Sequence, residues 1–262
     1  MGVSVTKDDI IRGLRQGDVV HVHSSLSSFG QVEGGAEAVI TALMEVLTEE
    51  GTLMMPSYGE FRGGEYGMVQ GNSILFDVRT SPSKMGRIPD VFWRMTGVRR
   101  SIHPTHCQAA WGKRGDWLLE GHERCLQSCG YGTPLWKLPQ CEGEILLIGV
   151  DHRSNTFIHT LEDAGLAPST SRSRFEPKVI DYDGNIVTVP THPHLPGLAR
   201  RFHIGDDFCR ERGLQTETTV GNARLRLINA CGFWDAAQAK LRADPLFFID
   251  AAYYKSRASD HK

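Results

Sequence analysis

Residues 144–164 read EILLIGVDHRSNTFIHTLEDA, and the pattern of this stretch indicates the fold class. Its first part, 144–150, is a continuous apolar run rich in branched side chains and too short for a comfortable helix. We therefore predict a strand that is covered on both faces. After the polar turn DHRSN, residues 156–164 fit a short helix that a polar side chain can cap and that Gly165 ends. Such a strand–turn–helix unit is typical of layered α/β sheets, where ligands bind beyond the carboxyl ends of the strands.

The N-terminal part of the chain repeats this order of elements. Residues 18–23, DVVHVH, alternate Val with polar positions and predict a first strand, and an entry helix is predicted before it over 6–15. Residues 36–47 carry apolar side chains at helical spacing, and 52–55 read as a second strand. A right-handed crossover would make these two strands parallel.

The same kinds of pattern predict the secondary structure of the remaining segments. Residues 57–79 are rich in Gly and poor in apolar anchors, which predicts a long surface excursion that serves as a substrate wall or lid. A helix is predicted to start at 81–86, and 175–189 reads as a hairpin around Asp-Gly-Asn. Residues 204–212 and 224–241 read as mostly helical.

Length and composition fit one α/β domain over residues 1–262. We predict a mostly parallel central sheet covered by helices on both faces, with a small antiparallel addition. A hydrophobic content of 40% is that of a soluble globular protein, and the start of the chain shows neither a signal peptide nor a membrane span. These features predict a cytoplasmic protein, as a monomer or homodimer.

The charge balance narrows the class of partner. A net charge of −2 gives no general attraction for nucleic acid or for an anionic membrane, so we expect a small-molecule partner. The six cysteines show no paired metal-ligand spacing, which predicts free thiols and no bound metal.

The helix of the deciding stretch carries a candidate acid–base pair. His159 and Glu162 stand three residues apart, which places them on one helix face. There a carboxylate can orient the imidazole and stabilise it when it accepts a proton, which is a general-base arrangement. The alternative is an ordinary surface pair, since exposed pairs at this spacing are common and weak.

Three further segments offer candidate functional groups. The loop SSLSSFG at 24–30 presents hydroxyl and N–H groups to an anion such as a diphosphate, although a plain polar turn fits as well. Lys84 and Arg87 suit a phosphate, or a solvated basic face. Residues 103–107, HPTHC, place two histidines beside a cysteine, which is compatible with a zinc site or with Cys107 as a nucleophile. The better interpretation is that Cys107 is a small buried hydrophobic residue.

Several blocks taken in order and spacing resemble the aminoglycoside 3-N-acetyltransferase family. The likeness covers most of the chain and is more specific than any one motif. Its blocks are VHSSLSSFGQVEGG at 22–35, SPSKMG at 81–86, HPTHCQAAWG at 103–112, GYGTPLWKL at 130–138, ILLIGVDHRSNTFIHTLE at 145–162 and TVGNARLRL at 219–227.

The resemblance implies transfer of an acetyl group from acetyl-coenzyme A to an amine by direct attack in a ternary complex. Carried over to this sequence, it implies His159 as the general base, Glu162 as its carboxylate partner, and His103 as a histidine that borders the active site. The implied coenzyme-binding residues are His23, Ser24, Ser25, Leu26, Ser27, Ser28, Ser81, Ser83 and Met85.

Two departures from the family pattern bear on the acceptor. Cys107 and Gln108 replace a usual serine and a common aromatic, and the segment between Pro56 and Ser81 is shorter than the acidic insertion of typical members. The first hypothesis is an aminoglycoside as acceptor. The alternatives are a biosynthetic amine or amino sugar, another acyl group, a non-catalytic coenzyme A-binding homologue, and a metal-dependent hydrolase that uses His103, His106 and His152.

Overall fold

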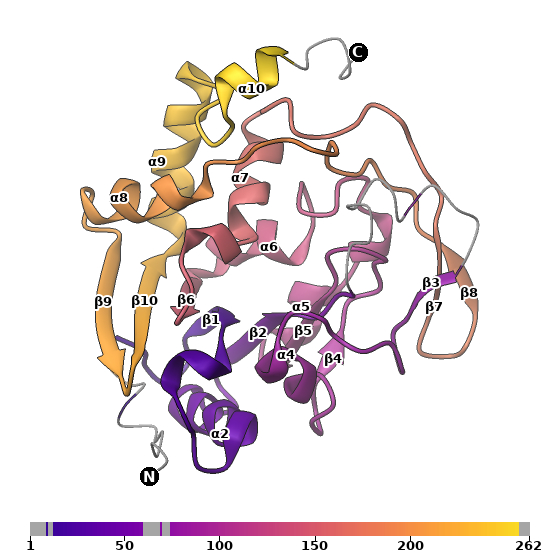
Figure 1. Cartoon of the computed structure of the whole chain (residues 1–262). Coiled ribbons are helices and arrows are strands. Elements are labelled where there is room, and N and C mark those ends of the chain that lie inside the picture. Colours follow the sequence, from indigo (N-terminus) through magenta and orange to yellow (C-terminus); the bar gives the residue numbers. More distant parts are fainter. Residues whose placement is uncertain (1–8, 10–12, 60–68, 70–73, 257–262) are drawn as a thin grey trace.

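The structure is a computed structural model that describes residues 9, 13–59, 69 and 74–256 (Figure 1). Its main element is a seven-stranded sheet with the strand order β4-β5-β2-β1-β6-β10-β9. The strands, in that order, are β4 Arg99–Arg100, β5 Gln108–Gly112, β2 Thr52–Pro56, β1 Val19–Ser24, β6 Glu144–Ile148, β10 Ala223–Asn229 and β9 Gln215–Val220.

The centre of this sheet is parallel. Strand β1 pairs in parallel with β2, where Val20 faces Leu53, and with β6, where Val22 faces Leu146. The outer strands β5 and β4 on one side, and β10 and β9 on the other, are added antiparallel. The predicted α/β class and its parallel centre are confirmed, and the antiparallel additions extend the sheet at both edges.

Helices cover both faces because the strand residues alternate between two apolar cores. Val20, Val22 and Leu53 point to one face, where α2 and α4 pack. Ile145 and Leu147 point to the other face, where the remaining large helices lie (Figure 1). The α-helices are α2 Gly35–Leu47, α4 Arg87–Phe92, α5 Gly115–Leu119, α6 Pro134–Lys137, α7 Phe157–Ala164, α8 Gly205–Arg210, α9 Ala230–Ala243 and α10 Ala251–Ser256.

Short 3₁₀-helices stand in the connections between these elements. They are η1 Leu26–Phe29, η2 His122–Arg124, η3 Leu138–Cys141, η4 His152–Ser154 and η5 Phe202–Ile204. No helix within the described ranges is long and apolar enough to cross a membrane.

A second, three-stranded sheet lies beside the β4 side of the main sheet (Figure 1). Strands β7 Lys178–Ile180 and β8 Ile186–Thr188 form the predicted hairpin, and β3 Ile74–Asp77 pairs with β7 in parallel. Strand β3 corrects one prediction: the end of 57–79 is anchored, since Phe76 and Val78 are buried. The rest of the predicted lid, 60–68 and 70–73, lies outside the described residues.

The C-terminal strand and the N-terminal segment differ in how they compare with the predictions. Residues 224–229 were expected to be helical, and this is wrong, because they belong to strand β10. The period-2 pattern RLRL was the signal, since Leu225 and Leu227 face one apolar core while Arg226 and Ile228 point to the opposite side. Most of the predicted entry helix over 6–15 lies outside the described residues.

Candidate active site

The site is built where strands β1 and β6 end and helix α7 begins. His23 lies near the end of β1, and its imidazole is buried. Its Nε2 accepts the backbone N–H of Thr156 at 3.3 Å. Burial lowers the pKa of His23 well below its usual value, which keeps this acceptor neutral. The side-chain oxygen of Asn155 accepts the N–H of Phe157, the first residue of α7, at 3.1 Å.

Helix α7 carries the predicted pair on one face. Nδ1 of His159 lies 3.3 Å from Oε2 of Glu162, and the same oxygen lies 3.3 Å from Nε of Arg200. The His159 side chain is 16% exposed, whereas Glu162 is fully buried. The surface-pair alternative is therefore wrong, because a solvated pair would leave its carboxylate in water.

Burial raises the pKa of Glu162 to about 7, against the opposing effect of the Arg200 and His194 charges. Around neutral pH the carboxylate can therefore exist in its charged form. When charged, Glu162 accepts the Nδ1–H of His159, which leaves the lone pair on Nε2 for a proton.

Two more histidines lie beside His159. The His194 ring is 4.3 Å from that of His159 between centroids, and the His106 ring is 5.8 Å away. His194 and Arg200 were not predicted as site residues, although the loop sequence THPHLP at 191–196 is rich in histidine. Only the folding of this loop against α7 brings these groups to the pair.

His103 has different surroundings. It is fully buried, its ring stacks on that of His122 at 4.3 Å, and its Nδ1 accepts the N–H of Thr105 at 3.3 Å. Of the two histidines in the HPTH block, the contacts place His106 beside His159 and His103 against His122. The role of His103 in the site stays a prediction.

The serine loop follows β1 directly. The backbone N–H of Ser25 donates to the Ile148 carbonyl at 2.9 Å, which joins the ends of β1 and β6. The hydroxyl of Ser28 donates to the Ser25 carbonyl at 2.6 Å, and the hydroxyls of Ser25 and Ser27 lie 3.1 Å apart. Ser27 is exposed, and Ser24 and Leu26 are half-buried. The loop thus presents hydroxyl groups at the carboxyl edge of the sheet.

The second predicted coenzyme block, residues 81–85, lies against the first. A Cβ built on Gly86 would stand 3.5 Å from the Ser24 carbonyl oxygen. The N–H of Lys84 donates at 2.9 Å to the carbonyl of Tyr58, which follows the end of β2. The structure therefore brings together two blocks that are far apart in the sequence.

Backbone contacts fix this second block. Ser83 is buried, and its N–H donates to Oδ1 of Asp90 at 2.9 Å, while Ser81 and Met85 are half-buried. The buried guanidinium of Arg100 donates to the Ser81 carbonyl at 2.7 Å. Arg100 was not predicted for this role. It links the block to β4.

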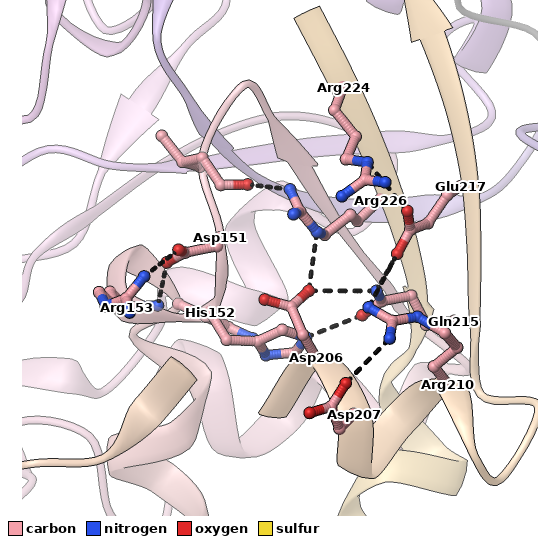
Figure 2. Close-up of polar contacts among 12 residues, drawn as sticks. Asp151, His152, Arg153, Asp206, Asp207, Arg210, Gln215, Glu217, Arg224 and Arg226 are labelled. Atoms are coloured by element: carbon pink, nitrogen blue, oxygen red, sulfur yellow. Dashed lines mark hydrogen bonds and ion pairs between the residues drawn. The ribbon is translucent and has the colours of Figure 1, made fainter. Parts of the chain in front are cut away.

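A polar network supports the turn between β6 and α7 from the side of β9 and β10 (Figure 2). Nε2 of the buried His152 lies 2.9 Å from the side-chain oxygen of Gln215. Oδ1 of Asp206 forms an ion pair with Arg226, 2.7 Å from its Nε, and accepts the side-chain N–H of Gln215 at 3.2 Å. Arg226 also donates to the Val150 carbonyl at 2.7 Å. Because His152 and Val150 belong to the turn, this network fixes the direction in which α7 leaves the sheet.

These positions argue against a metal-dependent hydrolase and against Cys107 as a nucleophile. His152 is held in the network above, apart from the surroundings described for His103 and His106. Within the part of the chain that the structure describes, no group of three or more His, Cys, Asp or Glu side chains could hold a metal ion. Cys107 is fully buried, and burial raises the pKa of its thiol to about 11, so it is neutral at pH 7 and no nucleophile.

A histidine with its carboxylate on a helix at the carboxyl edge of a parallel sheet, beside a hydroxyl-rich loop, suits an enzyme that removes a proton during group transfer. The family model of aminoglycoside 3-N-acetyltransferase matches residues 21–242. The chain belongs to this family and is an acetyltransferase. The family assignment also confirms the prediction of acetyl-coenzyme A as cosubstrate.

Individual relatives agree with this assignment. Aminoglycoside N(3)-acetyltransferase IV of Salmonella sp is 31% identical over 239 residues, which are 90% of this chain and 85% of that protein. The SPbeta prophage-derived aminoglycoside N(3')-acetyltransferase-like protein YokD of Bacillus subtilis is 38% identical over 173 residues, 61% of this chain and 63% of that protein. The crystal structure of AAC(3)-IVa apoenzyme superposes with a TM-score of 0.80 at 28% identity, covering 100% of this chain and 99% of that one.

Proposed function

We propose that this enzyme transfers acetyl from acetyl-coenzyme A to the 3-amino group of an aminoglycoside, by direct attack in a ternary complex. The observation that carries the proposal is the buried contact of His159 with Glu162, at the carboxyl edge of the parallel strands of this family's fold. Solved structures of the related AAC(3)-IVa, as a histidine-to-alanine variant, are complexes with gentamicin and with apramycin. The binary complex of AAC-IIIb with CoASH has the same fold.

His159 is the general base in this mechanism. An aliphatic amine is mostly protonated at neutral pH, so it must lose a proton before or during attack on the thioester carbon. Nε2 of His159 takes that proton, while the charged Glu162 holds Nδ1–H and stabilises the imidazolium. After this first proton has passed on to solvent, the free amine attacks, and the new C–N bond forms as the C–S bond breaks. The nitrogen that carries the new bond then loses its second proton, which passes through Nε2 of His159 to the leaving thiolate.

The serine loop is proposed to hold the coenzyme and to stabilise charge on the thioester oxygen. The hydroxyl groups of Ser25 and Ser27 are accessible to a ligand, since Ser27 is exposed and Ser25 is half-buried. Their oxygens lie 3.1 Å apart, so one hydroxyl can donate to the other while the second donates to the ligand. The Ser24 hydroxyl is buried at the end of β1 and makes no hydrogen bond within the described structure. Such donors contribute most when they are fixed before the reaction begins.

Thiol release from acetyl-coenzyme A tests the proposal, with a panel of 2-deoxystreptamine antibiotics and simpler amino sugars. We expect release with an antibiotic, and a fall of roughly 100- to 10,000-fold in turnover for His159→Ala with coenzyme affinity retained. The exposed His203 on η5 provides a matched control as His203→Gln, which should match the wild type.

The alternatives give different results in the same assay. Release with simple amino sugars alone would move the acceptor to a biosynthetic amine. Coenzyme binding without release from any amine of the panel would show that the acceptor is another amine or that the acyl group is not acetyl. Unchanged turnover in His159→Ala would overturn the role of this histidine as base.

A further inference from the structure

A second histidine–carboxylate pair lies directly beside the first. Asp163 follows Glu162 on α7, and its Oδ2 lies 3.7 Å from Nε2 of His194. Its other oxygen accepts the hydroxyl of Thr170 at 2.8 Å. The Asp163 side chain is fully buried, and that of His194 is 7% exposed. Water therefore screens this pair weakly.

Backbone pairing holds His194 in this position. His194 forms an isolated antiparallel bridge with Thr170. The N–H of Leu195 donates to the Ser169 carbonyl at 2.8 Å, and the N–H of Ser171 donates to the Pro193 carbonyl at 2.8 Å. The segments before and after His194 are thus fixed, and the backbone of His194 cannot move away from α7 without breaking this pairing.

The ring of His194 faces the ring of His159. Their centroids are 4.3 Å apart, with 37° between the ring planes. Two imidazolium ions at this separation would repel one another, so the protonation of one ring lowers the proton affinity of the other. The pair with Asp163 favours the charged form on His194.

We propose that His194, held by Asp163, is a positioning residue that keeps His159 in the neutral form that can accept a proton. The inference rests on the proposed role of His159 as base. Glu162 alone would favour a protonated His159, which cannot remove a proton from an amine. A positive charge on His194 offsets that effect. During the transfer the proton moves from the amine to Nε2 of His159, and His194 neither gains nor loses one.

Other charged or titratable groups of the described chain lie around the two rings. Glu162 and Asp163 lie on α7, and Arg200 follows the His194 loop and contacts Glu162 at 3.3 Å. His106, from the loop before β5, lies 5.3 Å from the His194 ring. Arg200 is engaged with Glu162, whereas the His194 ring packs directly against the His159 ring, with 4.3 Å between centroids.

The test is an NMR titration of the imidazole signals in the full-length protein, with His159 assigned by the signal that His159→Ala removes. In His194→Gln, the titration midpoint of His159 should rise by roughly one pH unit. Asp163→Asn keeps the ring but removes the carboxylate, and it should shift the midpoint in the same direction. His203→Gln is the control and should leave the midpoint in place.

Kinetics provide the second readout. The acid limb of the kcat/KM profile should move to higher pH by roughly one unit in both variants, so that the loss at pH 6 relative to the enzyme's own alkaline plateau is roughly tenfold greater in each variant than in the wild type. A His159 midpoint that stays in place or falls in both variants would overturn the inference, even if turnover falls. If His159→Ala keeps full turnover, the proposed base is wrong, while the midpoints still decide whether His194 controls the proton affinity of His159.

Discussion

Nε2 of His23, at the end of β1, lies 3.3 Å from the backbone nitrogen of Thr156, the N-cap residue of α7. The contact joins the central strand directly to the helix that carries the acid–base pair. It also gives His23 a structural partner, besides the coenzyme-binding role that the family resemblance implies.

His23→Leu should separate these two roles. The change removes the acceptor of a buried N–H and should lower the free energy of unfolding by about 1–3 kcal/mol. If the ring acts only through α7, turnover falls while the coenzyme Kd in calorimetry stays at the wild-type value. A raised Kd would instead place His23 in the coenzyme site.

Gly149→Ala should displace the serine loop. Gly149 has a φ of +65°, and a Cβ built on it would stand 1.7 Å from the hydroxyl oxygen of Ser28. We expect a loss of unfolding free energy of about 2–4 kcal/mol and a raised KM for acetyl-coenzyme A.

Gly213→Ala is the matched control for this change. Gly213 has a similar φ of +66°, but nothing lies within 4 Å of an added Cβ. It should cost only the backbone strain, about 1 kcal/mol, and leave KM unchanged. Equal effects of the two substitutions on KM would show that contact with Ser28 is not the cause.

Glu162→Gln should change the pH profile of the enzyme. Burial raises the pKa of Glu162 to about 7, so the carboxyl group takes up a proton as the pH falls through 7. The neutral carboxyl group then no longer stabilises the imidazolium of His159. For the wild type we expect an acid limb in kcat/KM near pH 7 that belongs to the coupled His159–Glu162 pair. The variant should be ~10- to 100-fold slower at pH 8, with a displaced limb. A superimposable profile would refute the orienting role of the carboxylate.

Arg226→Met should destabilise the turn that precedes α7. The change leaves the mostly buried carboxylate of Asp206 without its cation, and we expect a loss of about 2–4 kcal/mol in chemical unfolding. Lys113→Met breaks the exposed pair of Lys113 with Glu50 and should cost about 0–1 kcal/mol. If the two losses were equal, the network would contribute no more than a surface ion pair.

Acidification should destabilise the folded enzyme between pH 6.5 and 5. Four buried histidines have pKa values below 6.5 because burial disfavours their charged form, so the unfolded chain binds more protons in this range. Glu144 and Glu162, whose pKa values burial raises to about 7, act in the opposite direction, but they are fewer. Urea midpoints at several pH values measure the effect, and midpoints that rise toward pH 5 would contradict it. The histidines are His21, His23, His122 and His152.

The sequence alone determined the layers of the fold and the central pair. Apolar runs and helical spacing identify β1, α2, β2, β6 and α7 because both depend on local side-chain periodicity. The three-residue spacing of His159 and Glu162 fixes their shared face in the same way. The strand β10 was missed, although its alternation was visible, because helical and strand patterns compete over short segments.

The groups that surround that pair are brought together by tertiary folding. His194, Arg200 and His106 come from loops whose paths have no local periodicity, and the contact of Glu162 with Arg200 joins residues 38 positions apart. The pKa of Glu162 likewise depends on burial, which the packing of α7 against its neighbours creates. A sequence pattern can therefore name a candidate base and its carboxylate, but the proton affinities of these groups depend on neighbours that only folding brings together.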